Sequence, residues 1–273
     1  MSYETVILKD KKDLTDQILT LLPKANVLGA YENPDHIDFD SIEVLSVKFS
    51  RVGKVTLERF PNLKWVVCRS HGIDTVNRDD CVKRNVGIVA MNPHSTQCAN
   101  WIYDKMIDFE SVTIFGNGSI SKALQSKLTT YNVVDSKTER HVIDEYLKDS
   151  KTVVSVLPLN DRTENYFDEY KFNLMPNGVN IISISRGDLF NSNALEGFVR
   201  GEKLNKGHFD MLPTKHRESI VKHPNVSYYN HTSFEFGDVA QDQYGQQLKL
   251  VVDRCLLDDV KNPELGRTNN KWF

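Results

Sequence analysis

Residues 112–128 constrain the fold of this chain more than any other stretch. An apolar run, 112–115, is followed by Gly116 and Gly118 and then by a helical pattern. The stretch predicts a strand, a tight turn and a helix in which every fourth residue is apolar, at Ile120, Leu124 and Leu128. Gly116 can adopt the backbone angles of a sharp turn, and Gly118 lets the main chain approach an anion at the helix N-terminus. We therefore expect the helix to pack on a sheet and to present its first turn to a phosphate group.

The two glycines match the first two positions of the G-x-G-x-x-G dinucleotide-binding fingerprint, and Ser121 stands at the third. Asp135 follows Gly116 by about 20 residues, which is the offset of the carboxylate that binds the ribose of NAD. The pattern predicts an NAD site made by Asp135 and by the turn, namely Gly116, Asn117, Gly118, Ser119 and Ile120. A methyltransferase remains an alternative, because such enzymes have similar glycine turns.

Asp135 also bears on the choice between the two nicotinamide cofactors. Its carboxylate should bind the ribose hydroxyls and repel a 2′-phosphate, which favours NAD over NADP. Ser136, Lys137 and Arg140 follow directly and favour the opposite choice. We expect NAD.

Composition and charge exclude several classes of partner. The 273 residues, 40% of them hydrophobic, are enough to fill two α/β cores. The formal net charge is -3 and there is no long basic run, so nothing indicates binding to nucleic acid or to an anionic membrane. No segment has ~18 successive apolar residues, and the N-terminus lacks the pattern of a signal peptide. We expect a cytoplasmic protein.

The four cysteines lie far apart in the sequence, at Cys68, Cys81, Cys98 and Cys255. They form neither a C-x-x-C pair nor a Cys/His cluster at metal-ligand spacing. We expect reduced, partly buried thiols and no metal site.

Apolar runs alternate with helical patterns along the chain, which predicts an α/β fold with doubly wound parallel sheets. The runs are 5–8, 26–29, 44–49, 63–67, 86–90, 112–115, 131–135, 152–157, 179–183, 207–210 and 225–231. Helices are predicted over 14–21, over 164–174 and, as a long last helix, over 240–255. Ser95 or Thr96 can cap a further helix before the glycine turn, and we place a domain boundary near Ala99.

Polar side chains follow several of these runs. Arg186, Asp210 and His231 each come after an apolar run of the part that contains the glycine turn. In a parallel sheet they converge on one carboxyl edge, where open α/β sheets bind ligands. The turn 69–74 follows an earlier run and is a candidate substrate loop, although an ordinary βα turn explains it as well. Each of these residues, taken singly, also has an ordinary structural explanation.

In order and spacing the chain resembles the D-isomer-specific 2-hydroxyacid dehydrogenases over residues 49–231. The matching pieces are Ser70-His71-Gly72-Ile73-Asp74, Phe115-Gly116-Asn117-Gly118, Val156-Leu157-Pro158-Leu159-Asn160 with Thr163, Ser185-Arg186-Gly187, Asp210, and His223-Pro224-Asn225-Val226 before His231. The resemblance implies a flavodoxin-like substrate domain, residues 1–98 and 236–273, with a Rossmann-type NAD domain, residues 99–235, inserted in it.

The resemblance also implies roles for single residues. Arg186 would hold the substrate carboxylate and polarise its C2 oxygen, and His231 would donate a proton to that oxygen. Asp210 would face the nicotinamide carboxamide. Other cofactor contacts would come from Leu157, Pro158, Thr163 and Ser185. The substrate, a small 2-keto or 2-hydroxy acid of the D-isomer, would meet backbone N–H groups of His71 and Gly72, and Ser50 with Arg51 falls where some members bind an anion, although a solvated arginine fits equally.

Four departures from the family pattern stand out. Ser121 replaces the third glycine, Asn100 stands where an Ala-Glu pair is usual, and the long helix and projecting arm before the glycine turn are missing. Lys215, followed by His216, occupies the position of the glutamate that pairs with the catalytic histidine. Glu218 is the only other carboxylate between Asp210 and His231, and it is a candidate replacement if the loop folds inward.

Two functions therefore stay open beside the methyltransferase. The first is an NAD-dependent D-2-hydroxyacid dehydrogenase that reduces 2-keto acids, with Arg186, His231 and Glu218 as catalytic residues. The second is a non-catalytic or weakly catalytic NAD-binding protein of the same fold, which the altered glutamate position supports. Without the arm, we expect a monomer or a homodimer through a surface unusual for the family.

Overall fold

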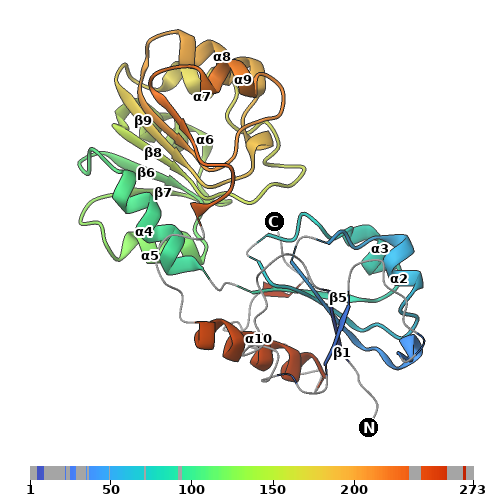
Figure 1. Cartoon of the computed structure of the whole chain (residues 1–273). Helices are drawn as coiled ribbons and strands as arrows, with labels where there is room; N and C mark the ends of the chain where they lie inside the picture. The colour runs from blue at the N-terminus through green and yellow to red at the C-terminus, as the bar shows by residue number, and fades with distance from the viewer. Residues whose placement is uncertain are drawn as a thin grey trace. The chain divides into compact units, whose positions relative to one another are not determined.

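The computed structural model describes residues 5–8, 22, 25–28, 35, 37–48, 50–70, 72–91, 94–233, 241–256 and 267–268. The chain divides into two compact units. The first unit consists of Met1–Pro93 and Val239–Phe273, and the second is His94–Asp238 (Figure 1). The helix predicted over 14–21 lies outside the described residues.

The first unit is built on a six-stranded sheet in the order β12-β5-β4-β3-β1-β2. Its strands are β1 (Thr5–Leu8), β2 (Ala25–Leu28), β3 (Val44–Val47), β4 (Trp65–Cys68), β5 (Gly87–Ala90) and β12 (Arg267–Thr268). Neighbouring strands are parallel, except that β12 runs antiparallel to β5. The order 2-1-3-4-5 of the first five strands is that of flavodoxin-like sheets.

Separate hydrophobic clusters cover the two faces of this sheet. The short helices α2 (Lys54–Glu58) and α3 (Arg78–Lys83) contribute Leu57 and Cys81 to one of them, and the turn η1 (Phe39–Ser41) adds Phe39. The long helix α10 (Gln241–Leu256) packs on the other face, with Leu248, Val251, Val252 and Cys255. A segment from the end of the chain thus covers a sheet made mostly by its beginning.

The second unit is built on an all-parallel sheet in the order β11-β10-β9-β8-β6-β7. Its strands are β6 (Val112–Phe115), β7 (Asn132–Val134), β8 (Thr152–Ser155), β9 (Val179–Ser183), β10 (Leu204–Phe209) and β11 (Val226–Tyr228). The chain turns to one side of β6 to form β7 and then crosses to β8 on the other side. This reversal is a topological switch point, where such sheets bind ligands. The predicted fold class, two doubly wound parallel sheets, is confirmed.

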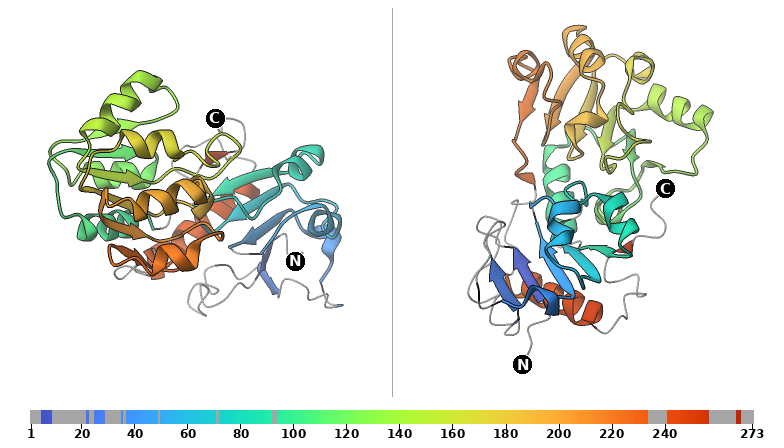
Figure 2. Two further views of the ribbon diagram at one scale, coloured as in Figure 1. Left: turned by 90° about the horizontal axis from the view of Figure 1, so that it is seen from above. Right: turned by 90° about the vertical axis from the view of Figure 1, so that its right-hand side faces the viewer.

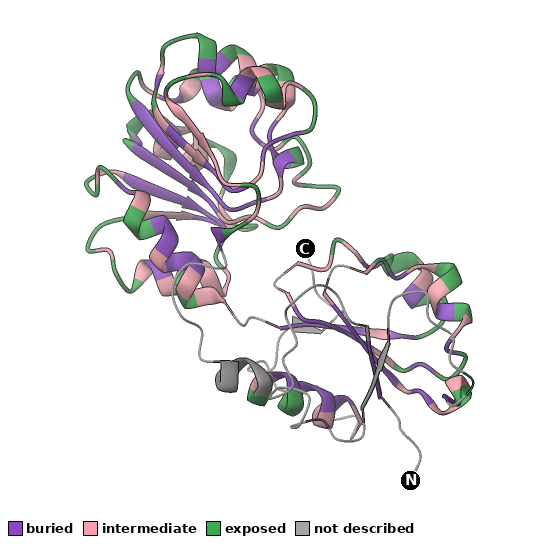
Figure 3. Cartoon of the chain, in the orientation of Figure 1, coloured by how far each residue is buried: buried purple, intermediate pink, exposed green. Residues whose placement is uncertain are grey.

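Helices lie on both sides of the second sheet (Figure 2). Buried residues of α4 (Ser95–Lys105) and α5 (Ser119–Gln125) form a cluster with Ile114, Val154 and Ile182 on one face. On the other face lie α6 (Arg140–Asp149), α7 (Glu169–Leu174), η2 (Gly187–Leu189), α8 (Ser192–Arg200) and α9 (Arg217–Val221). The strands β6, β8 and β9 are buried throughout (Figure 3), as expected of parallel strands covered on both faces.

Two predicted boundaries need correction. Helix α4 belongs wholly to the second unit, because Cys98, Ala99, Trp101 and Ile102 pack in its core. The division therefore lies before α4 and not at Ala99, and His94, rather than Ser95 or Thr96, is the N-cap residue.

The helix predicted over 164–174 is shorter than expected. Asn165 adopts a left-handed conformation, with φ 53°, and Phe167 forms a β-bridge with Phe190. Helix α7 begins only at Glu169, where the Asp168 carboxylate caps it by accepting a hydrogen bond from the Lys171 N–H at 3.0 Å.

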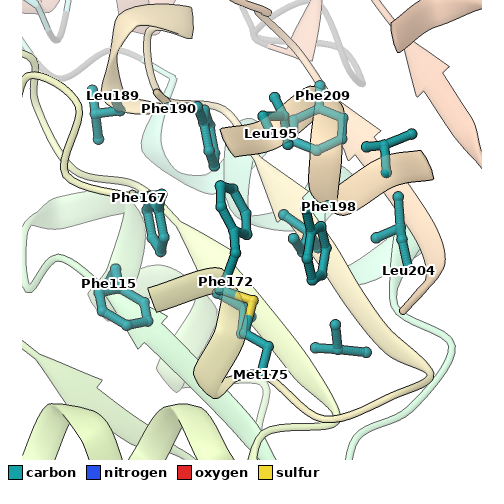
Figure 4. Packing of buried hydrophobic residues seen from close by; sticks show 14 of the residues in the cluster. Phe115, Phe167, Phe172, Met175, Leu189, Phe190, Leu195, Phe198, Leu204 and Phe209 are labelled. Atoms are coloured by element: carbon teal, nitrogen blue, oxygen red, sulfur yellow. The ribbon is translucent and has the colours of Figure 1, made fainter. Parts of the chain in front are cut away.

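Six phenylalanines dominate the core between the second sheet and helices α7 and α8 (Figure 4). Phe172 stacks on Phe198 with ring centroids 4.7 Å apart, and Phe167 stacks on Phe190 at 5.0 Å. Phe115 and Phe209 meet this row edge-on, at 5.0 Å from Phe167 and 5.6 Å from Phe190. All six rings are buried, so they fix α7 and α8 on the sheet that carries the strand ends described below.

We expect Phe172→Ala to lower the free energy of unfolding by about 3–5 kcal/mol, because it removes a buried ring from a packed row and leaves a cavity. Val221→Ala is the control, since Val221 on α9 is 39% exposed, and it should change the value by less than about 0.5 kcal/mol. Urea unfolding followed by circular dichroism measures both. Equal losses would show that the phenylalanine row is not what stabilises this core.

Candidate active site

The carboxyl ends of the second sheet bring most of the predicted residues of this unit to one edge. Gly116 follows β6, Asp135 follows β7 and Asp210 follows β10. Arg186 and His231 lie a few residues beyond the ends of β9 and β11. Because the strands are parallel, this edge is the ligand-binding edge of the sheet.

The glycine turn has the geometry that its sequence predicts. Gly116 has φ +113°, and a Cβ placed on it would lie 3.0 Å from Val156 Cγ2 and 3.1 Å from the Val156 carbonyl oxygen. Glycine is therefore required both by the backbone angle and by the neighbouring end of β8. Gly118 is the N-cap of α5 and, among the described residues, no side chain caps that helix. Its first-turn N–H groups are thus left to bind an anion.

Asp135 lies beside this turn with an ionised carboxylate. The Lys137 N–H donates to Oδ1 at 2.9 Å, and Asn117 Nδ2 donates to Oδ2 at 3.2 Å. These two hydrogen bonds, the Lys137 one first, hold the pKa of the carboxyl below its usual range. The uncapped turn, the close approach at Gly116 and the ionised carboxylate together fit a bound dinucleotide.

Ser121, at the third fingerprint position, is buried and polar. Its hydroxyl accepts a hydrogen bond from Gln125 Nε2 at 2.8 Å, and the same amide lies 3.4 Å from Asn117 Oδ1. Since Asn117 in turn donates to Asp135, a row of hydrogen-bonded side chains links the buried Ser121 to the Asp135 carboxylate.

The loops after β8 and β9 are held by their own hydroxyl groups. Thr163 Oγ1 donates to the Pro158 carbonyl at 2.6 Å, and it also accepts from the Asn160 N–H at 2.8 Å. Leu157 is half-buried and Pro158 exposed. Ser185 Oγ lies 2.9 Å from Ser155 Oγ in a buried pair. Thr163 and Ser185 thus shape these loops.

Arg186 and His231 come together at the edge of the sheet. Arg186 Nη1 lies 3.4 Å from His231 Nε2 and 3.8 Å from Met211 Sδ. The next residue, Gly187, explains how Arg186 is placed, because a Cβ there would lie 2.2 Å from the Leu212 carbonyl carbon. Only glycine lets the 185–187 turn pack so closely against the segment after β10.

The loop that carries His231 has an unusual backbone. Asn230 and His231 both have positive φ, 52° and 63°, a conformation that costs a residue with a Cβ roughly 1–2 kcal/mol. The loop is held in place by the main chain of β10, where the Asp210 carbonyl accepts the His231 N–H at 2.7 Å. Such strain persists only where the surroundings determine it, and it clusters at functional sites.

The Asp210 carboxylate makes structural contacts that the sequence does not indicate. It is buried and accepts hydrogen bonds from the Thr232 N–H at 2.8 Å, the Ser233 N–H at 2.9 Å and Ser233 Oγ at 2.8 Å. The side chain thus clamps the loop that follows His231, and its contact with a nicotinamide stays a prediction.

The expected replacement of the family glutamate by Glu218 is not supported. The Glu218 side chain is exposed on α9 and, within the described part of the chain, takes part in no hydrogen bond or ion pair. The segment before it faces α8: Lys215 Nζ donates to Asn193 Oδ1 at 3.1 Å, and His216 Nδ1 lies 3.0 Å from Glu196 Oε2. These contacts, with His216 at φ 63°, direct α9 toward α8.

The predicted substrate residues of the first unit lie at the ends of β3 and β4. Ser50 and Gly72 are half-buried, Arg51 is exposed, and His71 lies outside the described residues. Ser70 Oγ donates to the Gly72 carbonyl at 2.9 Å, which shapes the 70–72 turn.

In the first unit, Arg69, the first residue of the candidate substrate loop, is wholly buried and donates to Ser46 Oγ at 3.1 Å. Sequence reasoning missed several residues of the second unit. In the second unit, Met211 contacts Arg186, and Tyr229 with His208 lies beneath the His231 loop. The one available signal was position, since Tyr229 precedes His231 by two residues and His208 precedes Asp210 by two.

The arrangement has a definite chemical capacity. A guanidinium within 3.4 Å of an imidazole nitrogen can direct a fixed positive charge and a titratable proton toward the same oxygen of a small anion. Among the described residues, no cluster of three or more His, Cys, Asp or Glu side chains could hold a metal ion, and the four cysteines are buried free thiols. None of the described helices is long and apolar enough to cross a membrane.

Comparison with known proteins identifies the second unit. Residues 91–233, more than half of the chain, match the family model of the D-isomer specific 2-hydroxyacid dehydrogenase NAD-binding domain. No curated protein sequence gives a significant match.

Many solved structures share the fold. A D-lactate dehydrogenase from Aquifex aeolicus, complexed with NAD and lactic acid, has 15% sequence identity and a TM-score of 0.76, over 94% of this chain and 96% of that chain. An NAD+-bound 3-phosphoglycerate dehydrogenase from Entamoeba histolytica has 14% identity and a TM-score of 0.78, over 100% of both chains. An NADPH-dependent glyoxylate/hydroxypyruvate reductase from Sinorhizobium meliloti has 14% identity and a TM-score of 0.76, over 99% of this chain and 100% of that chain.

At these identities the structural likeness shows the fold, and the family model shows the family. The match covers the glycine turn, Asp135, Arg186, Asp210 and His231. The chain belongs to the D-isomer specific 2-hydroxyacid dehydrogenase family and carries that family's NAD-binding domain.

Proposed function

We propose that this protein is an NAD-dependent oxidoreductase that interconverts a small 2-keto acid and the corresponding D-2-hydroxy acid. The observation that carries the proposal is the pairing of Arg186 Nη1 with His231 Nε2, 3.4 Å apart, at the carboxyl edge of the sheet that also carries Asp135. Family membership supports a dehydrogenase role.

In this proposal the two side chains act on one carbonyl group. The Arg186 guanidinium binds the substrate carboxylate and stabilises the negative charge that develops on the C2 oxygen. His231 Nε2 donates the proton to that oxygen during reduction and takes it back during oxidation. The nicotinamide, when bound, supplies or accepts the hydride. Contacts from Ser50, Arg51, His71 and Gly72 of the first unit stay predictions.

A second candidate, an NAD-binding protein with weak or no catalysis, rests on the segment 215–218. Lys215 occupies the position of the family glutamate and binds Asn193, while Glu218 is exposed. Turnover of a keto acid with NADH separates the two candidates, because both bind the cofactor.

We expect the protein to oxidise NADH in the presence of at least one member of a panel of 2-keto acids. His231→Asn should lower kcat by about 10²–10⁴-fold, the contribution of a general acid, and leave the Kd for NADH unchanged, since the imidazole is proposed to act on substrate. His141→Asn, at an exposed histidine of α6, is the control and should retain full activity. A His231→Asn variant as active as the control would remove His231 from the mechanism.

NADH should bind more tightly than NADPH, because the ionised Asp135 carboxylate accepts hydrogen bonds from the ribose hydroxyls and repels a 2′-phosphate. Asp135→Asn should reduce the ratio of the Kd for NADPH to the Kd for NADH by about tenfold or more, because a hydrogen bond to a charged group contributes about that much to binding. Asp149→Asn, at the exposed end of α6, is the control. Fluorescence titration measures both cofactors, and tighter binding of NADPH by the unmodified protein would contradict the assignment of Asp135.

The same preference should persist on the acidic side of neutrality. The pKa of Asp135 is lowered, so the carboxylate is charged at every pH above the ordinary aspartate pKa of about 3.9. The ratio of the Kd values should therefore be constant from about pH 8 to about pH 5 once titration of the 2′-phosphate itself is allowed for. If the ratio decreases toward one across this range by more than the titration of the 2′-phosphate explains, a titrating group other than Asp135 determines the preference.

We also infer that the chain does not form an arm-exchanged dimer. Only residues 106–111 separate α4 from β6, and at about 3.5 Å per residue they span on the order of 20 Å, too short to leave the unit and return. We expect a monomer or a dimer through another surface. A crystal structure with an interface built from residues 100–111 would contradict this inference.

A further inference from the structure

Beneath the His231 loop lies a group of side chains that the proposed reaction does not use. Strand β10 alternates its side chains, so Phe209 enters the phenylalanine core while His208 and Asp210 face the side of α4. On that side Trp101 and Lys105, one helical turn apart on α4, meet Tyr229 from the end of β11. We call Trp101, Lys105, His208 and Tyr229 the Tyr229 cluster.

Tyr229 is held at its ring and at its hydroxyl group. Its ring meets the buried Trp101 ring edge-on, with centroids 4.9 Å apart and an interplanar angle of 86°. Its hydroxyl lies 2.9 Å from His208 Nδ1. Lys105 Nζ lies 5.7 Å from the Tyr229 ring centroid and 5.9 Å from that of Trp101. Packing and a hydrogen bond thus fix both the position and the rotation of the phenol.

His208 is suited to accept a hydrogen bond from the phenol. Burial, and then the nearby Lys206 and Lys105 ammonium groups, lower its pKa to about 4, against a smaller opposing effect of Asp104. The imidazole is therefore neutral at physiological pH and has one ring nitrogen free to accept.

Main-chain hydrogen bonds connect the position of Tyr229 to the conformation of His231. The Tyr229 N–H donates to the Phe209 carbonyl at 3.0 Å, and the Tyr229 carbonyl accepts from Thr232 Oγ1 at 2.9 Å. Asn230 and His231, both left-handed, lie between these two anchor points. A shift of Tyr229 must therefore change the turn that presents the imidazole.

We propose that Tyr229, through its hydrogen bond to His208 and its contact with Trp101, is a positioning residue that holds His231 in its strained, Arg186-facing conformation. The proposal rests on the proposed function for its catalytic consequence, but the conformation of His231 can be observed without turnover. Asp210 clamps the loop after His231, and the Tyr229 cluster holds the loop before it.

The test compares three variants of the full chain. Tyr229→Phe removes the hydroxyl and keeps the ring, and His208→Leu removes the other partner of the same hydrogen bond. Tyr170→Phe is the matched control, because it removes a phenol that donates to Asp144 Oδ2 at 2.6 Å on the opposite face of the sheet. In protein with ¹³C-labelled histidine, loss of a signal in His231→Asn identifies the His231 resonance.

We expect the His231 resonance to shift and broaden in Tyr229→Phe and in His208→Leu, and to stay unchanged in Tyr170→Phe. With NADH and a keto acid substrate, kcat should fall about tenfold, as expected of a displaced catalytic group, while the Kd for NADH stays constant. The double variant Tyr229→Phe/His208→Leu should lose no more than the larger single loss, because both changes break one hydrogen bond.

The outcomes separate the proposal from the function on which it rests. If the unmodified protein reduces no keto acid, the proposed function fails, and the His231 resonance still decides the role of Tyr229. An unchanged His231 resonance and kcat in Tyr229→Phe would overturn the proposal, even if the melting temperature falls, since that combination describes ordinary packing.

Discussion

The close approach of β6 and β8 is the constraint on which the nucleotide-binding edge of this protein depends. The Val156 N–H donates to the Phe115 carbonyl at 2.9 Å. The next residue, Gly116, turns the chain away from β8 at a point where a Cβ would be too close to Val156. Gly116 meets this requirement with φ +113°. The turn directs the first turn of α5 and brings Asn117 against Asp135, so both parts of the predicted dinucleotide site follow from one backbone contact.

Much of the fold could be predicted because its strands are buried on both faces. A fully buried parallel strand is a continuous apolar run, and β9 at Val179–Ser183 occupies the same residues as the predicted run. Helix α9 and strand β12 are short and carry no such pattern, so they were missed. The start of α7 was misplaced because a left-handed Asn165 and the Phe167–Phe190 bridge are tertiary features that a helical period does not reveal.

The candidate site divides in the same way. That Arg186 and His231 would meet followed from strand ends and parallel order, which are readable in a sequence. The direction in which each side chain points could not be read from the sequence. The clamp that Asp210 forms on the loop after His231 was not predicted, and Glu218, the candidate partner of His231, is exposed on α9. Both outcomes depend on contacts between residues distant in the sequence, which spacing cannot order.

Ser121 shows why a departure from a motif has to be judged by its contacts. A Cβ at the closest point between helix and strand can clash with its neighbours. A hydroxyl buried there without a hydrogen-bond partner costs free energy. Here Gln125 supplies the partner from one turn further along α5, and its amide also lies next to Asn117, which donates to Asp135. The substitution therefore leaves the turn intact and adds a polar connection to the Asp135 carboxylate. A missing glycine in the fingerprint is thus no evidence against a dinucleotide site when a neighbouring side chain satisfies the residue that replaces it.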